Sequence, residues 1–345
     1  MSGGAAGTPA APRWLPGGHA QTIWAALASW RFEGPAPTWR RERWDTPDGD
    51  FIDADWLAAG DTAPAAAPLL VLFHGLEGSS ASHYSQAFAH WARARRWRLV
   101  IPHFRGCSGE INRAPRAYHS GDHEEIGWML ERARAAAPAA VHRVAVGVSL
   151  GGNALLRWAE EAGHTAARST QAVAAICSPI DLAASGQAMG RGFNRWAYTR
   201  MFLRSMKPRA LAKLAQHPGL FDRDRLLAAR TLYDFDNVFT APLHGFRNTE
   251  DYWTRASAKP QLQRIRLPAL LLNARNDPFV PTACLPVPGS VAEPVTLWQP
   301  AHGGHVGFPS GRFPGHVLGL PEAVMAWALP RLGATESARS EAGHG

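Results

Sequence analysis

The chain has 345 residues, of which 46% are hydrophobic and 19% are charged. This balance is typical of a folded chain with a large core and excludes a disordered one. The formal net charge of +8 suggests a nucleic-acid partner only if the basic residues cluster, and here they are scattered without a run of like charge. We therefore expect no binding of nucleic acid.

The chain ends and the cysteines indicate where the protein resides. Residues 1–12 and 333–345 are expected to be disordered, and the N-terminal stretch lacks the basic and apolar segments of a secretory signal. No apolar run approaches the ~18 residues that a membrane span requires. Three scattered cysteines are too few for a disulfide framework or a Cys-ligated zinc site. These features predict a cytoplasmic protein without stable membrane insertion.

The first elements are a short helix and an antiparallel pair of strands. A turn followed by a short helix is expected between residues 13 and 30. Residues 38–57 alternate in polarity as strands do, and residues 47–50 (Pro-Asp-Gly-Asp) supply a hairpin turn. This pattern predicts an antiparallel edge at the start of the sheet.

Apolar strands and helices then alternate along the chain. Strands are predicted at residues 68–73, 98–102, 143–148, 172–177, 268–273 and 294–298, and helices at residues 84–95, 123–136 and 321–332. Continuous apolar runs are typical of strands buried on both faces. The alternation predicts an α/β fold whose central sheet is mostly parallel, with helices on both faces.

Residues 180–258 interrupt this alternation. They contain helical pieces rich in Arg, Met and aromatic residues, with no plausible strand. An insertion of this kind between two sheet strands predicts a helical cap over the edge of the sheet. The core is then formed by residues 13–179 and 259–332.

A G-x-S-x-G sequence with Ser149 at its centre follows the strand at residues 143–148, and a helix-like stretch comes directly after it. Strand, sharp turn and helix form the context of a nucleophile elbow. The turn forces the serine into a strained backbone conformation, which the small glycines Gly147, Gly151 and Gly152 make sterically possible. An incidental serine in a glycine-rich loop is the alternative interpretation.

A serine hydroxyl needs a positioned base, and the base needs an orienting carboxylate. Proteins with a nucleophile elbow carry these groups in the order Ser, acid, His, in loops after late strands. Asp277 follows the second-to-last predicted strand, and His305 lies in the loop after the last one. His302 is a second candidate for the base. Asp181 is a second candidate for the acid, because the carboxylate need only reach the histidine.

Two backbone N–H groups are needed to stabilise the negative charge of a tetrahedral intermediate. One is expected from Leu150, directly after the nucleophile, and the other from Leu76, in the loop after the strand at residues 68–73. Because the donors belong to the backbone, the apolar leucine side chains are no obstacle.

A pair of histidines is a candidate metal site. His119 and His123 stand four residues apart beside acidic residues. The H-E-x-x-H pattern is absent, and acidic residues in this position suit the start of a helix. We therefore expect neither a metal nor a cofactor.

Together these segments resemble the α/β-hydrolase fold family, and within it the YheT-like branch, which also holds mammalian hydrolases and yeast medium-chain acyl ester synthases. The resemblance extends from about residue 13 to residue 332 and rests on residues 19–22, 73–79, 103–110, 118–121, 148–153, 239–246 and 302–308. It implies a carboxylic ester hydrolase with Ser149 as nucleophile, Asp277 as acid and His305 as base.

The predicted function is hydrolysis of short- to medium-chain acyl esters through an acyl-enzyme, with a small acyl ester as the expected partner. The cap is expected to form the acyl pocket with Phe193, Trp196, Tyr198, Met201 and Phe202. Two alternatives remain: an acyltransferase that passes the acyl group to an alcohol or thiol, and a non-catalytic binding protein of the same fold.

Overall fold

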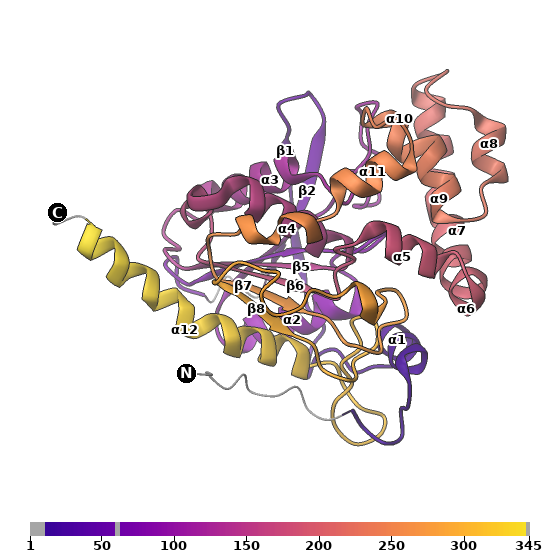
Figure 1. Ribbon diagram of the computed structural model, residues 1–345. Helices are drawn as coiled ribbons and strands as arrows, with labels where there is room; N and C mark the ends of the chain where they lie inside the picture. Colours follow the sequence, from indigo (N-terminus) through magenta and orange to yellow (C-terminus); the bar gives the residue numbers. More distant parts are fainter. Residues whose placement is uncertain (1–10, 59–62, 343–345) are drawn as a thin grey trace.

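A computed structural model describes residues 11–58 and 63–342, with side chains described as far as residue 333. Within these residues one sheet of eight strands has the order β1-β2-β4-β3-β5-β6-β7-β8 (Figure 1). The strands are β1 (Trp39–Asp45), β2 (Phe51–Leu57), β3 (Leu69–Phe73), β4 (Arg98–Pro102), β5 (Arg143–Val148), β6 (Ala172–Ile176), β7 (Ala269–Leu272) and β8 (Val295–Trp298). β1 and β2 form the predicted antiparallel hairpin, β2 is antiparallel to β4, and all other neighbours are parallel.

Helices cover both faces of the sheet, as the apolar strands predict. The helical elements of the core are α1 (Gly18–Leu27), α2 (His83–Ala94), α3 (His123–Ala136), α4 (Leu150–Ala162), η2 (Gly163–Arg168), η5 (Lys259–Arg264), η6 (Thr282–Cys284) and α12 (Gly319–Ala342). β3 shows how the faces divide: Leu69 and Val71 pack in the same cluster as side chains of α3 and α4, whereas Leu70 and Leu72 pack with α2 and α12. This alternation follows from the two-residue period of a strand.

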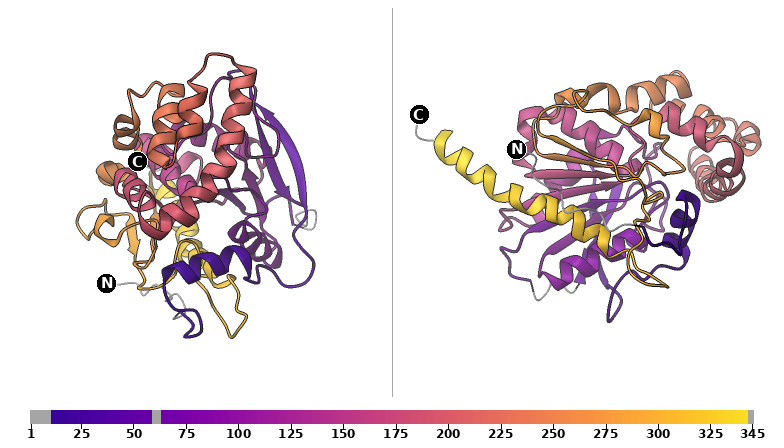
Figure 2. Two further views of the ribbon diagram at one scale, coloured as in Figure 1. Left: turned by 90° about the vertical axis from the view of Figure 1, so that its right-hand side faces the viewer. Right: turned by 60° about the horizontal axis from the view of Figure 1, so that its bottom comes forward.

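The insertion between β6 and β7 is helical, as predicted. Its elements before η5 are α5 (Leu182–Met189), α6 (Gly192–Asn194), η3 (Arg195–Thr199), α7 (Arg200–Gln216), α8 (Arg223–Ala228), α9 (Leu232–Phe235), η4 (Asp236–Thr240), α10 (Ala241–Leu243) and α11 (Thr249–Ala256). Part of this cap packs around a small core of its own that includes Leu203, Leu226 and Phe239. Figures 1 and 2 show the cap at the end of the sheet where β6 leads into α5.

The last helix is longer than predicted. α12 runs from Gly319 to Ala342 along one side of the sheet (Figure 2) and continues past Leu332, so the disordered tail expected from residue 333 is replaced by helix as far as residue 342. Gly333 does not end the helix, because the residues after it include the good helix formers Ala, Glu and Arg. Of the N-terminal stretch expected to be disordered, residues 1–10 lie outside the described residues. None of the helices described in the two ranges is both long and apolar enough to cross a membrane.

Candidate active site

Ser149 occupies the turn between β5 and α4, with φ 53° and ψ −120°. A side chain in this left-handed region strains the backbone. The strain comes with a very close approach of strand and helix: a Cβ on Gly147 would lie 2.6 Å from the Cα of Gly152. The Ser149 N–H donates to the carbonyl of Ile176 at 2.8 Å, which fixes the turn to β6. The serine therefore stands at the carboxyl ends of the strands and at the N-terminus of α4.

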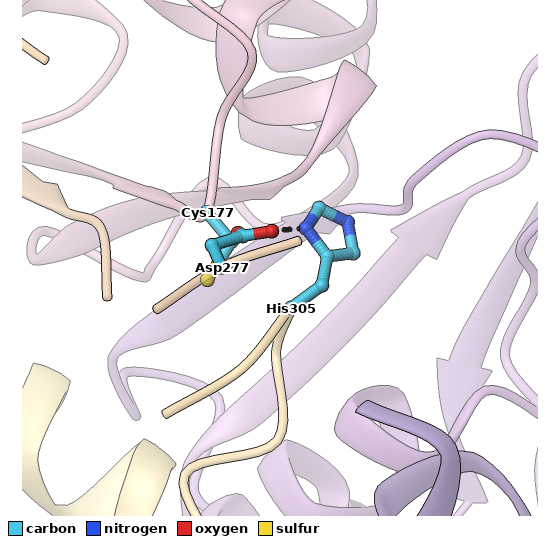
Figure 3. A group of neighbouring side chains, drawn as sticks. All are labelled: Cys177, Asp277 and His305. Atoms are coloured by element: carbon cyan, nitrogen blue, oxygen red, sulfur yellow. Dashed lines mark hydrogen bonds and ion pairs between the residues drawn. The ribbon is translucent and has the colours of Figure 1, made fainter. Parts of the chain in front are cut away.

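The structure brings the three predicted side chains together. His305 Nε2 lies 3.0 Å from Ser149 Oγ, and His305 Nδ1 lies 2.9 Å from Asp277 Oδ2. The other carboxylate oxygen of Asp277 accepts the backbone N–H groups of Phe279 and Val280, at 2.7 and 3.3 Å. A carboxylate only accepts, so Nδ1 carries the proton and Nε2 can take one from the serine hydroxyl. Figure 3 shows the carboxylate directed at the imidazole ring.

Cys177 completes a buried group with Asp277 and His305 whose ligand-type atoms lie within 4.8 Å of one another. The group does not fit a metal. Hydrogen bonds to Asp277 and Ser149 use both imidazole nitrogens, and burial raises the pKa of Cys177 well above its usual value, so the sulfur stays a thiol. The thiol sulfur instead accepts the N–H of Val306 at 3.3 Å, next to the histidine.

The loop at residues 302–308, here called the histidine loop, is held by α1. Gln21 Oε1 accepts the N–H of Gly303 at 3.0 Å, and Thr22 Oγ1 accepts the N–H of His305 at 2.8 Å. Both side chains are buried. These two residues stood in a segment that carried the family resemblance, but no role was predicted for them. Apart from that segment, the signal in the sequence was two polar residues beside the apolar residues of a short helix.

A second histidine supports the same loop. Burial lowers the pKa of His83 to about 4, so its ring is neutral at physiological pH. Its Nε2 lies 2.9 Å from the carbonyl oxygen of Val306 and donates to it. The backbone on both sides of the His305 Cα is thereby fixed, through Thr22 on one side and His83 on the other.

The two alternative candidates have other partners. His302 is exposed, and its Nδ1 lies 3.5 Å from Asn276 Nδ2. Asp181 caps α5 by accepting the N–H of Ala184 at 3.1 Å, and it pairs with Lys259 at 3.2 Å. Among the described residues, neither is hydrogen-bonded to Ser149 or His305.

The predicted oxyanion donors flank the serine. Residues 74–78 form what we call the oxyanion loop, where Gly75 N–H donates to Tyr84 Oη at 2.9 Å and Glu77 N–H donates to Tyr118 Oη at 3.1 Å. Between them, the N–H of Leu76 has no acceptor in the described part of the chain, and the same holds for Leu150, the first residue of α4. Both N–H groups are free to bind an oxyanion.

Two cavities open beside Ser149 and His305. The outer cavity, of about 550 Å³, lies between α1 and the cap. The inner cavity, of about 120 Å³, continues under the cap past Leu76 and Leu150. Of the five cap residues expected to form the acyl pocket, Tyr198, Met201 and Phe202 line the outer cavity, and Phe202 also lines the inner one.

The expectation that the other two residues, Phe193 and Trp196, line the pocket is wrong. Phe193 is 45% exposed and Trp196 is 69% exposed, and neither lines these two cavities. Both lie in the turn from α6 into η3, on the outside of the cap. An apolar residue in a short helix gives no indication of which face it presents, so the sequence could not separate them from Tyr198.

The strand order, the elbow and the Ser149–His305–Asp277 arrangement define the class of protein. A family model described as the alpha/beta hydrolase fold matches residues 68–311, and the chain belongs to this family. Among individual proteins, the chain is similar to "Putative esterase YheT" of Escherichia coli, with 38% identity over 299 residues that cover 84% of each chain. It is also similar to phospholipase ABHD3 of Mus musculus, with 29% identity over 289 residues, 81% of this chain and 69% of that protein.

A solved structure supports the fold assignment. The esterase Pf2001 of Pyrococcus furiosus superposes with a TM-score of 0.52 and 17% identity, covering 86% of this chain and 92% of that one. This similarity confirms the predicted fold class.

Proposed function

We propose that this protein is a serine hydrolase that cleaves carboxylic esters of short- to medium-chain acids through an acyl-enzyme. The observation that carries the proposal is the continuous hydrogen-bonded line from Ser149 Oγ through His305 to Asp277, which meets two cavities at the serine. Relatives named as an esterase and a phospholipase support the choice of esters as the substrate class.

In the proposed reaction His305 Nε2 takes the hydroxyl proton while Ser149 Oγ attacks the ester carbonyl carbon. The carbonyl oxygen becomes an oxyanion between the N–H groups of Leu76 and Leu150. His305 then gives its proton to the departing alcohol, which leaves the acyl group on Ser149. Water, deprotonated by the same nitrogen, releases the acid and restores the hydroxyl.

The two cavities suggest where the acyl and alcohol parts of a bound ester lie. His305 lines both cavities and can protonate a leaving alcohol from either side, so we assign the two halves of the ester by the remaining lining. Leu150 lines only the inner of the two, so we assign the leaving alcohol to the larger outer cavity. The acyl chain then occupies the inner cavity. Its 120 Å³ is slightly less than a cavity of about 150 Å³ that holds benzene, which corresponds to an acyl chain of about four to six carbons.

A fluorophosphonate probe tests the mechanism, because it labels an activated serine. We expect labelling of the wild-type protein and none of Ser149→Ala; labelling that persists in the variant would remove Ser149 from the proposal. A series of p-nitrophenyl esters from acetate to palmitate is expected to peak at butyrate or hexanoate. Ethyl ester formation in added ethanol would identify acyl transfer instead, and the absence of both labelling and turnover would identify a non-catalytic protein.

A further inference from the structure

The outer cavity opens between two segments that carry no acidic residue. Its wall includes Ile23 and Leu27 from α1 and Met201 from α7. Residues 13–32, which contain α1, and residues 182–221, which contain α5 to α7, have neither Asp nor Glu. The second segment has seven Lys and Arg residues. The surroundings of the opening are therefore strongly basic, although the basic residues do not form a run.

Four arginines of the second segment have no partner in the described part of the chain. All four are exposed, and none forms an ion pair or a side-chain hydrogen bond with a described residue: Arg191, Arg195, Arg200 and Arg204. The middle interval of this spacing crosses η3, which is a π-helical turn. Hydrogen bonds join residues four apart in an α-helix and five apart in a π-helix, so the four side chains follow one line along the helix.

A line of apolar side chains runs beside the arginines. Trp196 and Met201 each follow an arginine by one residue, and both are exposed. Met201 and Ser205, one turn later, line the outer cavity, so this line leads from the surface into it. Across the opening, Ile23 and Leu27 stand one turn apart on α1, and both are exposed. Exposed apolar side chains therefore gather around the opening, which is a sign of an interaction surface.

Ring contacts connect the two sides of the opening. The ring centroid of Phe193 lies 4.8 Å from that of His19 on α1 and 6.0 Å from that of Trp196. His19 Nδ1 also lies 3.2 Å from Tyr198 Oη. The left view of Figure 2 shows α1, in indigo, beside the cap helices. We call the exposed residues around the opening the mouth surface; they are Ile23, Leu27, Arg191, Phe193, Arg195, Trp196, Arg200, Met201 and Arg204.

We propose that the mouth surface docks onto an anionic lipid surface, with the outer cavity opening toward the lipid. The unpaired arginines attract the anionic headgroups, and the exposed Trp, Phe, Leu and Ile side chains enter the boundary between headgroups and acyl chains. A nucleic acid offers phosphates but no apolar layer, so it would satisfy only the arginines. Docking of this kind is peripheral and reversible, because it needs no spanning segment.

Sedimentation with vesicles tests the proposal. Ser149→Ala protein is used, so that no ester cleavage changes the lipid. Vesicles of phosphatidylcholine alone are compared with vesicles that contain phosphatidylglycerol, in low and in high salt. We expect binding to the anionic vesicles to be at least about tenfold stronger, and high salt to abolish the difference because it screens exposed charges. Equal binding to both kinds of vesicle, or to neither, would overturn the proposal. Retention on duplex DNA as strong as on anionic vesicles would show a general polyanion surface instead.

Two matched sets of four Arg→Gln substitutions assign the binding to the mouth surface. The first set removes its four arginines. The second set removes exposed arginines near the amino ends of β4, β5 and β6, at the opposite end of the sheet from Ser149: Arg96, Arg132, Arg134 and Arg168. Both sets lower the net charge equally. We expect the first set to weaken binding to anionic vesicles by about tenfold or more and the second by much less. Equal losses would contradict a role of this surface, and circular dichroism checks that both variants fold.

A polarity-sensitive fluorophore shows which face meets the lipid. It is attached to Leu27→Cys, where the native residue is 79% exposed on the mouth surface, or to Val141→Cys, where the native residue is 59% exposed shortly before β5. The three native cysteines are buried, so labelling is confined to the introduced thiol. Anionic vesicles should shift the emission of the label at position 27 to shorter wavelength and leave the label at position 141 unchanged. The same shift at both positions would show unspecific adsorption.

The outcome is independent of the proposed esterase function. Turnover that is lost in Ser149→Ala supports the esterase whether or not vesicles are bound. Vesicle binding by the Ser149→Ala protein supports docking whether or not the wild-type protein cleaves esters.

Discussion

Two backbone hydrogen bonds to Asp277 determine which nitrogen of the His305 ring carries the proton. Because Oδ1 is occupied by the N–H groups of Phe279 and Val280, only Oδ2 faces His305. In Asp277→Asn the amide oxygen takes the same backbone donors, so the NH2 group faces Nδ1. The imidazole must then carry its proton on Nε2, where it cannot accept one from Ser149.

We therefore expect Asp277→Asn to lower kcat by about 10⁴, as the same exchange does in another serine triad. Stopped-flow and steady-state rates with p-nitrophenyl butyrate measure the loss, and circular dichroism checks the fold. A variant that keeps kcat within about tenfold of the wild type would show that Asp277 is not the orienting acid.

The hydroxyl of Thr22 holds the backbone N–H of His305. Thr22→Val keeps the shape of the side chain but leaves the partly buried N–H of His305 without its acceptor, at a cost of about 1 kcal/mol. We expect kcat to fall on the order of tenfold with little change in KM, because the ground-state contacts to substrate remain. Thr22→Ser restores the acceptor and is the control; an equal loss in both variants would attribute the effect to packing.

An ion pair between Arg209 and Glu77 connects the cap to the oxyanion loop. Arg209 on α7 donates to Glu77 Oε1 at 3.0 Å, and Tyr118 Oη donates to the same oxygen at 3.1 Å. Glu77 itself has a left-handed φ of 57° directly after Leu76. The conformation of the loop that presents the Leu76 N–H therefore depends on a cap helix.

Arg209→Met is expected to lower kcat on the order of tenfold, since it leaves the largely buried Glu77 carboxylate without its cation. Arg209→Lys should recover part of the loss. The double variant with Glu77→Gln distinguishes the ion pair from simple packing of α7: when Glu77 carries no charge, loss of Arg209 should matter less. Additive losses in kcat would contradict a role of the pair.

The core elements could be predicted because their sequence pattern is local. Six apolar runs and a Pro-Asp-Gly-Asp turn specify strands whose ends agree with the structure to within about two residues. The chain order Ser, acid, His that accompanies a nucleophile elbow located Asp277 and His305 in the loops after the last two strands. The contacts of Gln21 and Thr22 could not be predicted in this way, because Thr22 and His305 are 283 residues apart and no periodicity links them. In the cap, the sequence indicated helices but not which faces line a cavity.

Two buried carboxyl groups of the β1–β2 hairpin, those of Asp50 and Asp55, make the stability of the whole molecule depend on pH in the acid range. Asp50 is buried and accepts from Asn112, from the backbone N–H of Arg113 and from Arg105. Burial alone would raise the pKa of Asp50, but these donors lower it to about 2. Asp55 is also buried, and its bonds from His103, Arg41 and Ser80 outweigh burial and bring its pKa well below the usual range.

A folded-state pKa below the unfolded value of about 3.9 means that the unfolded chain binds protons first as the pH falls. The stabilisation is therefore complete above about pH 4 and is lost toward pH 2. We expect the urea midpoint of unfolding to fall steeply between pH 4 and about 2. Asp50→Asn should be less stable than the wild type at pH 7, and the difference should shrink in this acid range. A difference independent of pH would show that the carboxylate charge is not the cause.

The hydrogen bonds between α1 and the histidine loop also determine when the site can form during synthesis of the chain. Gln21 and Thr22 emerge from the ribosome 282 and 283 residues before Gly303 and His305, whose N–H groups they bind. A nascent chain that already holds its serine turn and its oxyanion donors still lacks a fixed imidazole. The contact of His305 with Ser149 therefore forms with its support only after α1 has met the histidine loop, and we expect a nascent chain that has not reached residue 305 to have no activated serine.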